Sequence, residues 1–226
     1  MRHLAKRLPR ACCSRHDPKL VVTNEKSKMT KPVWHEPGVT RSHRWNKHGL
    51  SGATVWLTGL SGSGKSTIAN ELARELLNTS RLAYILDADN LRHGLNADLG
   101  YSDPDRIENI RRVAEVACLM ADAGIVAIVP IISPFVASRA HARKIHDDNS
   151  LQFIEVHVAT TIDECERRDT KGLYAKVRNG EMTGLSGVDS VYEPPTKPDV
   201  VVGANEETLE QSVAMVLAKL LIDADK

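Results

Sequence analysis

Residues 59–66 constrain the fold of this chain more than any other stretch, because they read Gly-Leu-Ser-Gly-Ser-Gly-Lys-Ser and fit the pattern G-x-x-x-x-G-K-[ST]. An apolar segment over 53–58 precedes the pattern, and apolar residues at helical spacing follow it over 65–78. A strand, a glycine loop and a helix in this order make a phosphate site, because loop N–H groups and the positive helix end converge there. The chain is therefore predicted to bind a nucleoside triphosphate; a glycine-rich turn before a helix is the competing interpretation.

The residues expected to contact ATP are Gly59, Leu60, Ser61, Gly62, Ser63, Gly64, Lys65, Ser66 and Thr67. Within this loop, the Lys65 ammonium would reach the β- and γ-phosphates. The Ser66 hydroxyl would bind Mg²⁺, the cofactor expected to accompany ATP.

Apolar, strand-like runs alternate with helical patterns from residue 53 onward. The strand-like runs are 53–58, 82–86, 125–132, 153–158 and 199–202, and the helical patterns are 65–78, about 105–123, 136–147, 161–168 and 205–223. Continuous apolar runs are typical of parallel strands that are covered on both faces. The alternation predicts an α/β fold of the P-loop NTPase type, a three-layer sandwich with a mainly parallel sheet and helices on both faces. Pro130 should end its strand.

Residues 169–198 break this alternation, with four Gly, three Pro and little apolar periodicity. A loop of this length inside a compact domain is usually functional. We expect a mobile lid over about 169–193, which would close over the nucleotide and keep water from taking the phosphoryl group.

The N-terminal part differs in charge from the rest of the chain. Residues 1–50 hold 12 Lys and Arg against 3 Asp and Glu, whereas the remaining 176 residues hold 18 against 26. We expect 1–30 to be a disordered tail or the result of a start assigned too early, 31–50 an ordered arm on the domain, and 51–226 the domain that carries the glycine loop. Without a basic face on the folded body, nucleic acid is not an expected partner.

The four cysteines show no C-x-x-C spacing, which predicts reduced thiols, no disulfide framework and a cytoplasmic location. Cys118 and Cys165 lie in helical patterns and are expected to be buried. No apolar run reaches the length of a membrane span, so no membrane association is expected.

Asp87 and Asp89 follow the apolar run that begins at residue 82. Ligands of open α/β sheets bind at the carboxyl ends of the strands, so both carboxylates should face the glycine loop. One would serve Mg²⁺ and the other an acceptor hydroxyl. A helix N-cap or an Asx turn is the structural alternative for this D-x-D-N sequence.

Several cations follow these carboxylates and suggest an anionic acceptor. Arg92 and Arg106 are expected to contact the ligand, and Asn109 shares a helix face with Arg106. For Arg111 and Arg112, a solvated helix surface is the favoured interpretation.

These residues resemble one family. The stretches are Asp87-Ala88-Asp89-Asn90-Leu91-Arg92-His93-Gly94-Leu95-Asn96, Leu99-Gly100-Tyr101-Ser102, Arg106-x-x-Asn109, Ile132-Ser133-Pro134, Arg168-Asp169-x-Lys171-Gly172-Leu173-Tyr174 and Gly187-Val188-Asp189-Ser190-x-Tyr192-Glu193-x-Pro195. Over about 34–222 the chain resembles adenylyl-sulfate kinase (APS kinase). The resemblance implies a Mg²⁺-dependent, cytoplasmic homodimer that transfers the γ-phosphoryl of ATP to the 3′-hydroxyl of adenylyl sulfate, giving PAPS and ADP in sulfate assimilation, with association with ATP sulfurylase as a further expectation.

The resemblance also implies residue roles. Catalytic roles fall on Lys65, Asp87, Asp89 and Ser133, metal binding on Ser66 and Asp87, and acceptor binding on Arg92, Tyr101, Arg106, Asn109, Ile132, Lys171 and Leu185. Ser133 matches a serine often labelled a phosphoserine intermediate. Direct in-line transfer needs no phosphoenzyme, so we expect Ser133 at a strand end near the ligands instead.

Among the departures from the family pattern, two concern the glycine expected at position 88 and the aromatic residue expected at position 185. Ala88 stands where Gly is usual, which would cost about 1 kcal/mol if that position needs positive φ. Leu185 replaces one aromatic residue of an adenine-stacking pair whose other member is Tyr101, at a loss on the order of 0.5–1.5 kcal/mol. Weaker acceptor binding is the expected result.

Three alternatives remain at this point. A P-loop kinase for a sugar or nucleoside shares the loop and the lid but not the 87–112 sequence. A GTP-binding switch would use Thr196-Lys197-Pro198-Asp199 as a guanine motif, but that motif should end an apolar strand. A non-catalytic sensor of the nucleotide sulfate would not need Lys65, Ser66, Asp87 and Asp89 intact.

Overall fold

The computed structural model describes residues 32–33, 35–205 and 207–222 of the 226-residue chain. Its strands are β1 (Ala53–Thr58), β2 (Ala83–Ile85), β3 (Val126–Pro130), β4 (Gln152–Val158) and β5 (Val200–Val202). Its helices are α1 (Arg41–His48), α2 (Lys65–Asn78), α3 (Ala88–Leu91), α4 (Asp103–Ala123), α5 (Val136–Asp148), α6 (Ile162–Arg168), α7 (Leu173–Arg178) and α8 (Leu209–Ile222). The expected tail, residues 1–30, lies outside the described residues.

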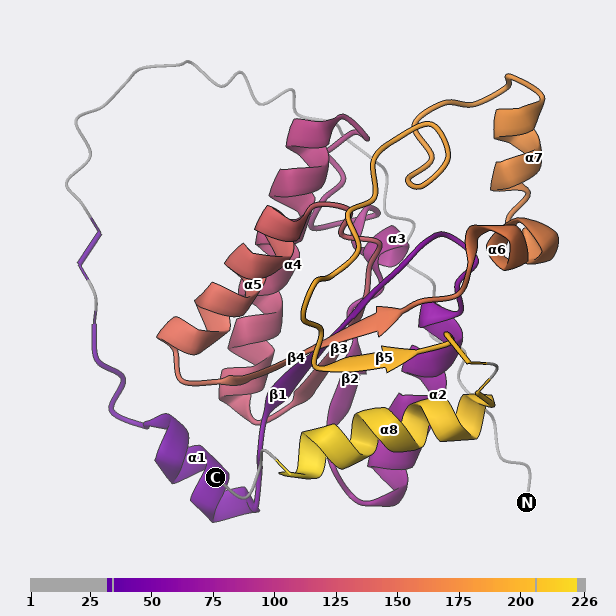
Figure 1. Cartoon of the computed structure of the whole chain (residues 1–226). Coiled ribbons are helices and arrows are strands. Elements are labelled where there is room, and N and C mark those ends of the chain that lie inside the picture. Colours follow the sequence, from indigo (N-terminus) through magenta and orange to yellow (C-terminus); the bar gives the residue numbers. More distant parts are fainter. Residues whose placement is uncertain (1–31, 34, 206, 223–226) are drawn as a thin grey trace, which may run out of the picture. The chain divides into compact units, whose positions relative to one another are not determined.

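The five strands form one parallel sheet in the order β2-β3-β1-β4-β5, with β1 in the middle (Figure 1). Ala53 pairs with Val126 of β3 on one side and with Gln152 of β4 on the other. Every residue of β1 is buried, as the continuous apolar run predicts for a strand covered on both faces. Because all strands run the same way, their carboxyl ends, and the loops that follow them, meet at one edge.

Helices cover both faces of the sheet and complete a three-layer sandwich, which confirms the expected α/β architecture (Figure 1). Helices α2 and α8 lie on one face, where Ile68 and Leu72 join the aliphatic residues of β1, β3 and β4. Helices α4 and α5 lie on the other, with Val113 and Ala117 packed around Trp56. Two buried layers hold the sheet rigid beneath the loops at its carboxyl edge.

Three short helices, α1, α3 and α7, were not predicted from apolar periodicity. Neither α1 nor α3 buries a residue, and α7 buries only Tyr174, so none carries the stripe that reveals a longer helix. Helix α7 means that the expected lid is partly helical rather than an irregular loop. Pro130 is the last residue of β3, as predicted.

Helix α1 packs against α4 within the stretch expected to be an arm. Thr40 caps its first turn, and Gly49 ends it in the left-handed conformation that favours glycine. The Asp122 carboxylate at the end of α4 accepts hydrogen bonds from both Arg41 and Arg44. The Trp45 indole donates to the Asp122 carbonyl at 3.1 Å, so one residue of α4 holds three side chains of α1.

Two general expectations concern thiols and membranes. Cys118 and Cys165 are both buried and free, as predicted. Across the described ranges, no helix combines the length and the apolar character that a bilayer span requires.

Candidate functional site

The glycine loop joins the carboxyl end of β1 to the first turn of α2, at the centre of the sheet edge. Gly59 allows the chain to turn beneath β4, since a Cβ there would lie 2.5 Å from the Val158 carbonyl oxygen. Gly64 has φ +104° directly before the helix, a conformation that a residue with a Cβ rarely adopts. The Thr160 hydroxyl donates to the Ser63 carbonyl at 2.9 Å and fixes the loop from the β4 side. The sequence therefore builds a curled loop that opens a helix N-terminus.

Lys65 is buried inside this loop. Its Nζ donates to the carbonyl oxygens of Gly59 at 2.9 Å and Leu60 at 2.6 Å. Burial away from water lowers the pKa of the Lys65 ammonium to about 8. The ammonium also feels the charges of Lys171, Asp89 and Asp87, which places it within electrostatic reach of the next strand end and the lid. A bound phosphate would replace these carbonyl contacts with a stronger one, in which donor and acceptor are both charged.

A cavity of about 190 Å³ lies beside the loop. It is lined by Ser63, Gly64, Thr67, Ile68, Val158, Thr160, Arg168, Gly203, Glu207, Leu209 and Ser212. Thr160 and Gly203 follow β4 and β5, which sequence reasoning did not connect with the nucleotide. The rule that ligands sit at the carboxyl ends of strands was the available signal, since both residues stand two or fewer positions beyond a strand.

Asp87 adopts the structural alternative that the D-x-D-N sequence left open. Its Oδ1 accepts hydrogen bonds from the N–H groups of Asp89 at 3.0 Å and Asn90 at 3.1 Å and so caps α3. These two bonds use only one carboxylate oxygen. Ala88 lies in the first turn of α3 and is not among the residues with positive φ, so its replacement of Gly carries no backbone strain.

Asp89 is joined to the lid. Its Oδ2 accepts a hydrogen bond from the Lys171 Nζ at 2.5 Å, and both side chains are more than half exposed. The Asp89 carboxylate raises the pKa of Lys171 above its ordinary value. The structure therefore brings together two predicted site residues that are 82 positions apart in the chain.

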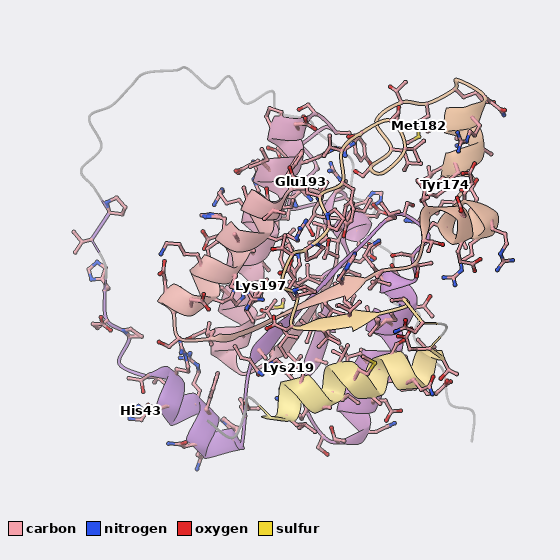
Figure 2. All side chains as sticks on the ribbon, in the orientation of Figure 1. His43, Tyr174, Met182, Glu193, Lys197 and Lys219 are labelled. Carbon is pink, nitrogen blue, oxygen red and sulfur yellow. The ribbon has the colours of Figure 1, made fainter. Side chains whose placement is uncertain are left out.

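The lid also rests on the glycine loop. Tyr174 of α7 is buried, and its hydroxyl donates to the Ser61 carbonyl at 2.9 Å. Figure 2 labels Tyr174 and Met182 on this part of the chain. Leu185 is 4% exposed and packs with Cys165 and Tyr174 in the cluster inside the lid. Its side chain thus supports the lid from within, whereas the Tyr101 side chain is 70% exposed.

Arg92 and Arg106 hold the loop before α4. The Arg92 guanidinium donates to the carbonyls of Leu99 and Gly100 and lies 4.3 Å from the centre of the Tyr101 ring. Arg106 donates to the Tyr101 carbonyl at 2.8 Å and, from its Nη atoms, to two oxygens of the lid, on Gly184 and Ser186.

Asn109 is buried one turn further along α4, and its Oδ1 accepts from the Asn96 Nδ2 at 2.8 Å. Asn96 therefore sets the orientation of the Asn109 amide. The sequence had shown Asn96 only as part of a motif, without a role of its own. Arg111 and Arg112 both pair with Glu108 on α4. Arg111 is exposed, as the interpretation as a solvated face predicts, whereas Arg112 is half-buried and also pairs with Asp98.

Ser133 lies just beyond β3 and is 1% exposed. Its φ of +42° is uncommon for a residue with a side chain. The Trp56 indole donates to its Oγ at 3.1 Å, and Oγ also lies 3.4 Å from the Ile131 carbonyl. The preceding residue, Ile132, is half-buried, and its carbonyl accepts from the Thr58 hydroxyl. Ser133 is thus at a strand end, as predicted.

The Thr196-Lys197-Pro198-Asp199 motif does not end a strand. Asp199 stands directly before β5, where its carboxylate accepts from the Glu155 N–H at 2.8 Å and pairs with Arg143. This placement removes the observation on which the GTP-switch alternative depended.

Comparison with known proteins gives a consistent result. The family model for adenylylsulphate kinase matches residues 51–203. An adenylyl-sulfate kinase from Clostridium acetobutylicum is 48% identical over 193 residues, which are 85% of this chain and 95% of the relative. The APS kinase CysC of Mycobacterium tuberculosis, solved with AMPPNP and APS, is 50% identical with a TM-score of 0.74, over 76% of this chain and 99% of that one. A hexameric APS kinase from Thiobacillus denitrificans is 27% identical with a TM-score of 0.59, over 81% of this chain and 32% of that one.

Proposed function

The chain belongs to the adenylylsulphate kinase family and is an ATP-dependent phosphotransferase; we propose how its own residues carry the γ-phosphoryl group of ATP to the 3′-hydroxyl of adenylyl sulfate, giving PAPS and ADP. The observation that carries the proposal is the convergence of the glycine loop, the 87–89 carboxylates and the lid at one sheet edge. Phosphoryl transfer depends on such positioning and on charge stabilisation rather than on covalent chemistry by the protein.

On the donor side, the 59–67 loop would hold the phosphates of ATP. Lys65 would leave the carbonyls of Gly59 and Leu60 and turn its ammonium to the β- and γ-phosphates. The exposed Ser66 hydroxyl and the Asp87 carboxylate are oxygen ligands of the kind that Mg²⁺ prefers, so the residues fit this ion. Bound there, Mg²⁺ would neutralise charge on the transferring group.

On the acceptor side, the Asp89 carboxylate would orient the 3′-hydroxyl and accept its proton. Lys171, which already pairs with Asp89, would then be free to meet the developing phosphate charge. Arg92, Arg106 and Asn109 would bind the anionic nucleotide. Tyr101 offers an exposed ring for its base, and the half-buried Ile132 an apolar wall.

Leu185 needs a different account from the stacking role that the family pattern implied. Because it is buried in the lid, we propose that it shapes the acceptor site through the fold of the lid.

Transfer would be direct, without a phosphoserine on Ser133. A serine nucleophile needs a base that takes its proton. In the part of the chain that the structure describes, the hydrogen-bond partners of the Ser133 Oγ are the Trp56 indole and the Ile131 carbonyl, and neither is a base. Ser133 would therefore shape the site through its backbone rather than act as a nucleophile.

Self-association and domain organisation follow as further proposals. The hexameric relative from Thiobacillus denitrificans supports self-association, and a homodimer is the form proposed for this chain, measurable by light scattering. Residues 31–50 would act as an arm on a kinase domain of 51–226, with the lid at about 169–193. A cytoplasmic location and an association with ATP sulfurylase, whose product is adenylyl sulfate, are also proposed.

An acceptor panel tests the proposed reaction. The protein is incubated with ATP, Mg²⁺ and one acceptor at a time: adenylyl sulfate, adenosine, or a sugar. We expect PAPS and ADP in equal amounts with adenylyl sulfate, and no comparable ADP release with the other two. ATP turnover on a sugar or nucleoside, with no PAPS, would favour the alternative small-molecule kinase. ATP binding without turnover on any acceptor would favour the sensor.

A further inference from the structure

Arg139 of α5 is a buried cation outside the site residues considered so far. It is 2% exposed, and its Nε donates to the Glu155 carboxylate of β4 at 2.8 Å. Burying a charge without a partner is costly, so Glu155 explains how the fold tolerates the guanidinium there. It does not explain why the remaining donors of Arg139 point at two other segments.

Those donors meet backbone oxygens of two segments that are far apart in sequence. Nη1 donates to the Ser133 carbonyl at 2.6 Å, and Nη2 donates to the Glu193 carbonyl at 2.7 Å. The guanidinium carbon also lies 6.0 Å from the centre of the Tyr192 ring. Arg139 thus joins the strand-end loop, residues 131–135, to the lid root, residues 192–193, where the chain returns from the lid. Figure 2 labels Glu193 on this return.

The same two segments are joined by further bonds. The Glu193 N–H donates to the Pro134 carbonyl at 2.8 Å, and its Oε2 accepts from the Val136 N–H at 2.7 Å. Val136 is the first residue of α5, whose N-cap, Phe135, makes no side-chain hydrogen bond, so Glu193 caps this helix from outside it. The Tyr192 hydroxyl lies 3.1 Å from the Thr58 hydroxyl at the end of β1.

Ser133 shows why this connection would matter. Its positive φ is a strained conformation, and such a conformation persists only where the surrounding structure fixes it. Arg139 holds its carbonyl, and Trp56 holds its Oγ. A change at the lid root would therefore reach the strand-end loop, beside the proposed acceptor site, through these contacts.

We propose that Arg139 is a positioning residue that ties the lid root to the strand-end loop and so sets the geometry in which the acceptor is phosphorylated. The proposal rests on the proposed function for its consequence in catalysis, but the contact itself is independent of substrate. Arg139 touches no reacting group. It acts through Ser133 and Glu193.

Arg143 provides a matched control, because it lies one helical turn further along α5. It also faces Glu155, at 3.9 Å, and pairs with Asp199, but its contacts are with Glu155, Asp199 and Phe153 rather than with Ser133 or Glu193. A purely structural role for a cation on α5 would give the same result for both arginines.

The test compares Arg139→Lys with Arg143→Lys by amide hydrogen exchange without substrate and by steady-state kinetics. For Arg139→Lys, which keeps the charge but cannot span three acceptors, we expect at least tenfold faster exchange at 131–136 and 192–193. We expect kcat for PAPS formation to fall on the order of ten- to a hundredfold, with the KM for ATP unchanged. For Arg143→Lys we expect neither change.

Val136→Pro keeps the proposal testable if Arg139→Lys does not fold. Pro is favoured at the first position of a helix, and Phe135 has φ −101° and ψ 130°, which suits the residue before a proline. This variant removes the N–H that donates to the Glu193 carboxylate and leaves Arg139 in place, and we expect faster exchange at 192–193 with a lower kcat.

Unchanged exchange in both Arg139→Lys and Val136→Pro would overturn the proposal, and so would equal effects of Arg139→Lys and Arg143→Lys. Failure of the proposed function would look different: the wild-type protein would make no PAPS, while the exchange difference between the two arginine variants would remain.

Discussion

Lys65 should couple ATP binding to the uptake of a proton at alkaline pH. In the free protein, burial lowers the pKa of its ammonium to about 8. Contact with the β- and γ-phosphates would favour the charged form and raise this pKa to its ordinary value or above. Since the complex holds the proton more tightly than the free protein, binding must take up a proton wherever free Lys65 is neutral.

The magnitude follows from these pKa values. With a pKa of about 8 in the free protein, Lys65 would be about one-tenth deprotonated at pH 7 and about nine-tenths deprotonated at pH 9. Binding of Mg²⁺ with a non-hydrolysable ATP analogue should therefore take up roughly 0.1 proton at pH 7 and roughly 0.9 at pH 9. The association constant should fall about tenfold between these pH values, which is about 1.4 kcal/mol.

Titration calorimetry in buffers of different ionisation enthalpy measures this uptake directly. Lys65→Arg is the matched control, because a guanidinium stays charged over the whole range and should show little uptake at pH 9. Equal uptake by the wild-type protein and Lys65→Arg would assign the proton to another group. No uptake by the wild-type protein, with an affinity independent of pH, would refute the reasoning about Lys65.

Three further predictions concern other parts of the fold. Leu185→Phe should overpack the lid cluster, so denaturation should show a free energy of unfolding lower by about 1–3 kcal/mol. Titration with adenylyl sulfate should show no tighter binding; tighter binding would instead support a stacking role for residue 185. Asp122→Ala removes the carboxylate that accepts from both Arg41 and Arg44, so trypsin should cleave α1 faster in this variant, with kcat unchanged. Equal cleavage rates in the variant and the wild-type protein would contradict this account of α1. Burial lowers the pKa of His146 in the folded protein, so the unfolded state binds a proton more readily as the pH drops below about 6.5. Urea melts should therefore show the free energy of unfolding falling over this range, less steeply in His146→Gln than in the wild-type protein; identical slopes would contradict this expectation.

The conformation of the proposed donor loop was predictable because its signal is local. A glycine pattern between an apolar strand and an amphipathic helix specifies its own conformation, and the structure places Lys65 inside that loop. The strand runs were also predictable, since burial on both faces demands continuous apolar residues, as in β1.

The proposed acceptor half depends on contacts that no local pattern contains. Lys171 meets Asp89 across 82 positions, and Arg139 meets Glu193 across 54. Leu185 shows the same limit, because its burial in the lid cluster depends on how the lid folds and not on the motif in which it stands. The short helices escaped prediction because a single turn such as α3 buries too little to leave an apolar stripe.

Steady-state PAPS formation by the wild-type protein and by Asp89→Asn tests the central account most directly. The wild-type protein should convert adenylyl sulfate and ATP to PAPS and ADP in equal amounts. The Asn side chain cannot accept the proton of the 3′-hydroxyl, so kcat should fall on the order of 10²–10⁴-fold, while ATP affinity measured by titration is retained. A wild-type protein that makes no PAPS, or an Asp89→Asn variant that makes it at the wild-type rate, would contradict the account.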